Sequence, residues 1–288
     1  MEERSFKKYI ILWLSQGISG LGSSMTGFAL VLWAYGQSHS AMSVSLMSFC
    51  NYVPYVFLSL FVGGFIDRHK KKTIMLVSDS IAAAGSLAVL VFLLMGSLEV
   101  WNIYAINAVV GITNAFQQPA SAVATGRLVP KEKISNVSGM NSFSNNLIVV
   151  FSPMLAAFLF AAGGLPLILL IDLASFAFAF CVLLFCITIP EQAQDKAYSS
   201  PFAGIAQGFD FLKKEKGILY IMLTMALINF CSRLTYENIL SPMILARSSG
   251  DSAALGIVNA CMGAGGIAGG IFVSVKKESR YKTAASNT

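Results

Sequence analysis

Three charged side chains lie deep inside long apolar stretches of the sequence, well away from the ends of those stretches. Asp172 stands in the run 165–189, and Arg233 and Glu237 stand in the run 218–245. A charge at membrane depth is costly and usually faces a cavity or a partner, so Asp172 is a candidate for binding a proton or a cationic ligand. Its alternative role is a structural hydrogen bond to a neighbouring helix, such as the third apolar stretch. Arg233 and Glu237 are spaced i, i+4, and they either neutralise each other or form a charge pair that changes partners during transport.

Uncharged polar side chains inside the apolar stretches are further candidates for binding a substrate or a proton. The main ones are Gln16, Asn51 and Asn141. Gln16 shares roughly one helix face with three small hydroxyl residues: Ser19, Ser23 and Thr26. Small residues are also ordinary packing material between membrane helices, so this face either lines a cavity or packs against another helix.

The segment GGFIDRHKKK, at residues 63–72, joins the second and third apolar stretches. Gly63 is expected to let two helices approach closely. Asp67 can pair with Arg68 or face the positive amino end of a neighbouring helix. We expect Asp79, which lies early in the third stretch, to pair with this loop. The lysines hold the loop at the anionic membrane surface: Lys70, Lys71 and Lys72.

The composition indicates an integral membrane protein. Of the 288 residues, 56% are hydrophobic and 12% are charged, and mean hydropathy is +0.69. A soluble domain carries about 25% charged residues. The five cysteines lie in apolar runs without CxxC spacing, which predicts buried thiols and no metal site. The sequence has no HExxH or GxSxG motif, so an enzyme is not expected, and no cofactor is predicted.

Eight stretches are long and apolar enough to cross a bilayer, which takes about 20 residues. Eighteen of the 20 lysines and arginines fall on one side of this alternation, and this predicts that both termini are cytoplasmic. The net charge of +6 is therefore explained by topology, and no nucleic-acid partner is predicted. The expected spans are 9–35, 44–66, 74–95, 101–125, 137–162, 165–189, 218–245 and 253–275.

The spans divide the chain into four parts. Residues 1–189 form an amino-terminal half with six helices, and residues 218–275 form the first two helices of a second half. Between them, residues 190–217 contain apolar residues at helical spacing before the basic run KKEK, which predicts an amphipathic helix on the membrane surface. Residues 276–288 form a polar cytoplasmic tail.

The order of residues in GGFIDRHKKK resembles the signature that the major facilitator superfamily carries between its second and third helices. Gly63, Asp67, Arg68, Lys71 and Lys72 stand on the signature positions. Three other runs are similar to the macrolide-efflux branch of that family: KKKTIMLVSDS, FQQPASAVATGRLVP and VVFSPMLAAFL. The resemblance implies an all-α, major-facilitator-type helical bundle in a bacterial inner membrane.

The resemblance also implies a function: proton-coupled efflux of macrolide-like or other amphipathic drugs, neutral or cationic, with Asp67 and Arg68 gating the cytoplasmic side. Two features depart from the family. Val110 stands where many proton-coupled exporters have an arginine. The antiport signature of the fifth helix is reduced to a helix-packing motif, with small residues in place of its glycines: Ser152, Pro153, Ala156 and Ala157.

The family has about twelve helices, so the chain is expected to be truncated after the eighth. Two alternatives therefore remain beside a drug exporter. One is a transporter of the same fold for another small molecule, by siderophore export or nutrient uptake. The other is an inactive fragment of a twelve-helix permease.

Overall fold

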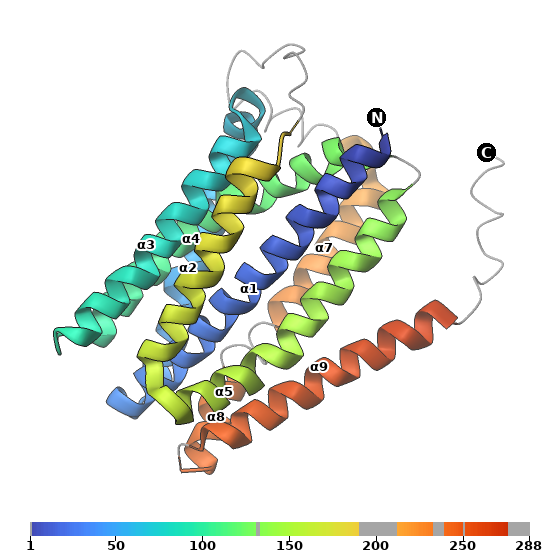
Figure 1. Cartoon of the computed structure of the whole chain (residues 1–288). Helices are drawn as coiled ribbons and strands as arrows, with labels where there is room; N and C mark the ends of the chain where they lie inside the picture. The colour runs from blue at the N-terminus through green and yellow to red at the C-terminus, as the bar shows by residue number, and fades with distance from the viewer. Residues whose placement is uncertain (1, 131–132, 190–211, 233–238, 250, 276–288) are drawn as a thin grey trace.

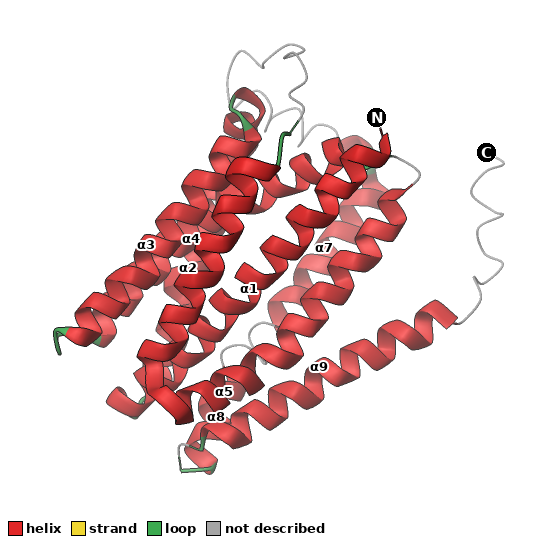
Figure 2. Cartoon of the chain, in the orientation of Figure 1, coloured by secondary structure: helices red, strands yellow, loops and turns green. Residues whose placement is uncertain are grey.

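The protein is an all-helical bundle in a computed structural model that describes residues 2–130, 133–189, 212–232, 239–249 and 251–275 (Figure 1). No strand occurs in these ranges (Figure 2). The helices are α1 (Glu2–Ser38), α2 (Ala41–Arg68), α3 (Lys71–Leu94), α4 (Val100–Leu128), α5 (Ile134–Cys181) with the π-helical turn η2 (Val182–Cys186), α7 (Lys216–Ser232), α8 (Ser241–Arg247) and α9 (Ser252–Val275).

Helix α5 consists of two segments that meet at Gly164. Gly164 has φ 68° and ψ −166°, a conformation that L side chains rarely adopt, and Pro166 follows it. The two segments run in opposite directions along the bundle in Figure 1. The break lies between the fifth and sixth predicted spans, so α5 covers both.

Four helical segments in the described part of the chain are long and apolar enough to cross a membrane: Phe6–Ser38, Ala41–Ser59, Lys71–Leu94 and Asn136–Cys186. The last has 51 residues, which is enough for two crossings of about 20 residues each. The predicted seventh span, 218–245, includes residues outside the described ranges: α7 is described as far as Ser232 and α8 from Ser241. Most of the predicted amphipathic helix lies outside the described residues, as does the polar tail.

The amino-terminal helices pack into one body, in which α1 lies mainly against α5, and α4 lies against both α2 and α3. Helix α9 packs against α5. Two apolar clusters are separated by a polar layer. Along α1, Tyr9 and Leu12 belong to the first cluster and Met25 and Ala29 to the second. The intervening turns carry the polar residues, and polar residues of α3, α4 and the second segment of α5 also lie between the two clusters.

Candidate functional site

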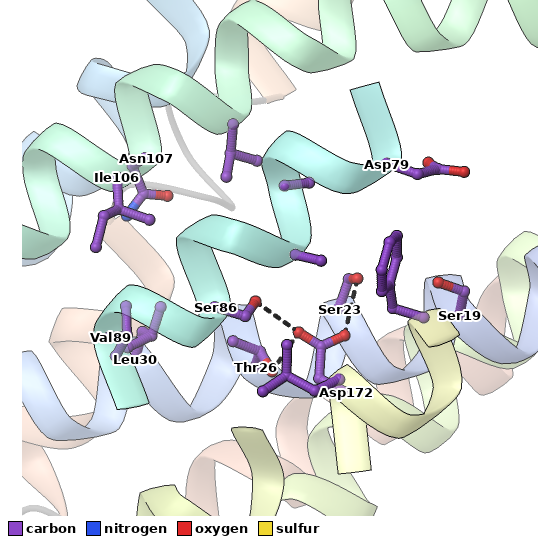
Figure 3. A pocket seen from close by; sticks show the side chains of 16 residues that line it. Ser19, Ser23, Thr26, Leu30, Asp79, Ser86, Val89, Ile106, Asn107 and Asp172 are labelled. Carbon is purple, nitrogen blue, oxygen red and sulfur yellow. Dashed lines mark hydrogen bonds between the residues drawn. The ribbon is translucent and has the colours of Figure 1, made fainter. Parts of the chain in front are cut away.

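A cavity of about 140 Å³ lies in the polar layer, between α1, α3, α4 and the second segment of α5 (Figure 3). Asp172 and Asp79 both line it, and no lysine, arginine or histidine is among its lining residues. The remaining lining residues are small, hydroxyl-bearing or apolar: Ser19, Ser23, Thr26, Gly27, Leu30, Ala82, Ala83, Ser86, Val89, Ile106, Asn107, Val110, Leu173 and Phe176.

Asp172 is the most deeply buried charged group of this cavity, with 4% of its surface exposed. Three hydroxyls from two other helices donate to its carboxylate. Ser23 Oγ lies 3.0 Å from Oδ1, and Oδ2 accepts from Thr26 Oγ1 at 3.1 Å and from Ser86 Oγ at 2.8 Å (Figure 3). Burying a carboxylate is costly unless it is hydrogen-bonded, and these donors offset that cost. The site therefore ties α1 and α3 to α5 through one carboxylate.

Gly22 allows α1 to approach Asp172 this closely. A Cβ at position 22 would lie 3.2 Å from Asp172 Cα and would overlap Ser175 Oγ. Ser175 Oγ in turn donates to the carbonyl oxygen of Asp172 at 2.8 Å. Any residue larger than glycine at position 22 would therefore push α1 away from the carboxylate.

Asp79 is held by two amides, and the expectation that it pairs with the loop at 63–72 is wrong. Gln117 Nε2 of α4 donates to Oδ1 at 2.7 Å, and Gln16 Nε2 of α1 donates to Oδ2 at 3.4 Å. Asp79 faces the interior of the bundle because it lies two turns before Ser86 on the same face of α3, and both line the cavity. The sequence candidate Gln16 therefore contacts Asp79.

The loop after α2 is anchored by its lysines. Lys72 Nζ donates to the carbonyl oxygens of Leu184 and Ile187, each at 2.8 Å, and so binds the carboxyl end of η2, where a cation is favourable. Lys71 is buried, and its Nζ donates to the carbonyl oxygen of Asp67 at 3.2 Å. The side chains of Asp67 and Arg68 are exposed.

The predicted close approach at Gly63 is wrong, because a Cβ there would meet nothing within 4 Å. A close approach of α2 to α4 is found instead where the backbone of Asn51 meets Gly111. Asn51 also donates to the carbonyl oxygen of Asn107 at 3.2 Å, which gives this candidate a packing role.

The remaining sequence candidates lie away from the cavity. Asn141 Oδ1 accepts from the Tyr9 hydroxyl at 3.0 Å and links α5 to α1. The helix-packing motif of α5 faces α9, where a Cβ at Gly256 would lie 3.6 Å from both Ala157 Cβ and the carbonyl oxygen of Pro153. The two other members of that motif are buried: Ser152 and Ala156. Arg233 and Glu237 lie outside the described residues.

Two residues of the site were missed by sequence reasoning. Ser86 had a usable signal, because it lies seven residues after Asp79 and so shares its helix face. Gln117 had a weaker one, as a polar residue within an apolar stretch, because nothing in the sequence told which helix it would face. The position without the family arginine, Val110, lines the cavity.

Comparison with known proteins gives one family. The model described as Major Facilitator Superfamily matches residues 12–284. Macrolide efflux protein A of Streptococcus pyogenes is 28% identical over 226 residues, covering 77% of this chain and 55% of that protein. Its namesake from Enterococcus faecalis is 30% identical over 194 residues, covering 66% and 59%. The enterobactin exporter EntS of Salmonella typhi is 24% identical over 262 residues, covering 90% and 62%. The chain thus spans little more than half the length of these relatives.

Proposed function

This chain belongs to the major facilitator superfamily, and we propose that it forms part of a proton-coupled exporter of amphipathic, neutral or cationic drugs of the macrolide kind. The observation that carries the proposal is the buried carboxylate of Asp172, which three hydroxyls from α1 and α3 hold inside the bundle. The similarity to macrolide efflux proteins supports the choice of cargo.

Proton binding at Asp172 would change the contacts between helices. An ionised carboxylate accepts all three hydroxyl bonds, whereas a protonated carboxyl becomes a donor through one of its oxygens. At least one of the three hydroxyls must then turn away or accept instead. Each protonation state therefore favours a different arrangement of α1 and α3 against α5, and a transporter can use such a difference to link a proton to movement.

The loop at 63–72 lies at the proposed cytoplasmic end of the transporter. The bonds from Lys72 to the end of η2 support a gating role, because they tie the start of α3 to the end of the sixth predicted span. Asp67 and Arg68 are exposed at this end of the bundle, where the second half of the transporter would meet them as the halves rock.

Both termini are proposed to be cytoplasmic, in the plasma membrane of a bacterium. The amino terminus and the α2–α3 connection lie at the same end of the bundle, which agrees with the positions of the basic residues (Figure 1). Alkaline phosphatase fused after Glu99 should be active and after Lys72 inactive. The opposite pattern would reverse the orientation.

Siderophore export is the second candidate, and the enterobactin exporter relative favours it because it aligns with 90% of this chain. An anionic siderophore would be expected to need cations, yet no lysine, arginine or histidine lines the described cavity. This favours the drug over the siderophore as cargo.

Accumulation of a radiolabelled macrolide tests the proposal in cells that lack their own macrolide exporters. Cells producing the 288-residue chain should accumulate less drug than cells with empty vector, and a protonophore should abolish the difference. Asp172→Asn should abolish it as well. Asp251→Asn is the matched control, because Asp251 is exposed and its acceptor role toward Ala253 N survives in asparagine.

Two other outcomes would contradict the proposal. Export of enterobactin, measured in the medium, without any change in macrolide accumulation would assign the chain to the siderophore alternative. Normal membrane insertion with no effect on either cargo would support an inactive fragment.

A further inference from the structure

Asp79 and Asp172 line the same cavity, and we infer that they act as one coupled proton-binding pair, in which a proton enters at Asp79 and passes to Asp172. The inference rests on the proposed proton-coupled transport and adds to it a second titrating residue and a route. The step is a proton transfer alone: protonated Asp79 and ionised Asp172 become ionised Asp79 and protonated Asp172.

The position of Asp79 along α3 suits a short relay to Asp172. Asp79 and Ser86 are two turns apart on α3, which is about 10 Å along the helix axis, and Ser86 donates directly to Asp172. The residues between them on this face are Ala82 and Ala83, whose small side chains leave the cavity open. A cavity of about 140 Å³ has room for several water molecules, since one needs roughly 10–15 Å³ of such space.

The charges around the cavity favour a shared proton. Helix α1 contributes Gln16 and hydroxyl residues, α4 contributes Gln117 and Asn107, and α5 contributes apolar side chains beside Asp172. None of these groups is cationic. Two ionised carboxylates in one cavity of low polarity repel each other, so binding a proton at one of them relieves the repulsion. Their titrations are then coupled.

The surroundings of Asp79 make it the entry point. It is less buried than Asp172 and lies nearer the end of α3 that carries the basic loop. Within the described part of the chain, Oε1 of Gln117 is a buried polar atom without a hydrogen-bond partner, and the amide nitrogen of the same side chain donates to Asp79. A protonated Asp79 carries a hydroxyl that Oε1 of Gln117 can accept once the amide turns. The amide thus has a partner in both protonation states.

Carbodiimide labelling tests the pair without requiring transport. Dicyclohexylcarbodiimide reacts with protonated carboxyl groups in apolar surroundings, and peptide mass spectrometry locates the product. The full chain in phospholipid vesicles would be labelled over a series of pH values. Both Asp79 and Asp172 should be labelled. Asp79→Asn should lower labelling of Asp172 at a given pH by roughly threefold to tenfold, because the repelling charge is gone.

The reciprocal variant keeps the test decisive if one protein does not fold. Asp172→Asn should lower labelling of Asp79 in the same way, Asp79→Glu should restore labelling of Asp172, and Asp251→Asn should change neither profile. Profiles that are independent of each other would overturn the pair, whatever the transport result. Protection by sodium ions at constant pH would overturn the proton as the shared ion. Reciprocal effects in a chain that exports no drug would support the pair and leave the proposed cargo rejected.

Discussion

The amino-terminal helices α1–α5 and the later helices α7–α9 bury different kinds of side chain. The first region buries polar groups, among them Thr26, Ser78 and Asp172, and pairs the carboxylate with hydroxyls of other helices. In the second region α7 buries none of its residues, and α9 meets α5 through glycines. Asn259 of α9 donates within its own helix, to the carbonyl oxygen of Leu255 at 3.1 Å.

The difference separates two ways of joining helices in a membrane. Lipid tails are as apolar as leucine, so apolar surface alone does not drive helices together. Small residues allow close contact without fixing a polar partner, which suits surfaces that slide. A buried carboxylate with several donors fixes which helices meet and at which turn, and it makes their packing sensitive to a proton.

The largest expected effect comes from a larger side chain at the carboxylate. Gly22→Val should destabilise the protein by about 3 kcal/mol, because its Cβ would overlap Ser175 Oγ and press on the backbone of Asp172. The thermal unfolding midpoint in detergent measures this. Gly27→Val is the control on the same helix, since a Cβ at Gly27 meets nothing within 4 Å. Equal losses in both variants would mean that the close approach at Gly22 contributes nothing.

A smaller and more local effect is expected where α9 meets α5. Gly263→Leu should weaken that contact by about 2 kcal/mol, because a Cβ at position 263 would lie 3.2 Å from Val150 Cα. Carbodiimide labelling of Asp172 should stay unchanged if the two regions are independent. Gly265→Leu is the control, with open space around that glycine. Altered labelling in Gly263→Leu would show that α9 influences the cavity and would remove the distinction between the regions.

The helices could be predicted well from the sequence, because a membrane span requires a continuous run of apolar residues, and such a run is visible in the sequence itself. It also found Asp172, since a charge inside such a run is conspicuous. It could not tell that Gly22 makes a close contact and that Gly63 makes none, because that depends on which helix lies opposite each glycine. Asp79 was assigned to the nearby loop for the same reason, since proximity along the chain was the available guide.

The smallest expected effect on stability is also the sharpest test of what the buried polar layer does. Ser86→Ala removes one of three donors to Asp172, and double-mutant cycles between membrane helices average about 0.6 kcal/mol per hydrogen bond, so the unfolding midpoint should barely move. The carboxylate keeps Ser23 and Thr26 as donors, yet it loses its contact with α3. Protonophore-sensitive drug export should therefore fall while the protein stays folded.

Ser80→Ala is the matched control, because the Ser80 hydroxyl donates within its own helix, to the carbonyl oxygen of Leu76 at 2.7 Å. If both variants exported drug equally well, the Ser86 hydroxyl would contribute to packing alone. The polar layer of the first region and the glycine contacts of the second would then both serve only to hold helices together.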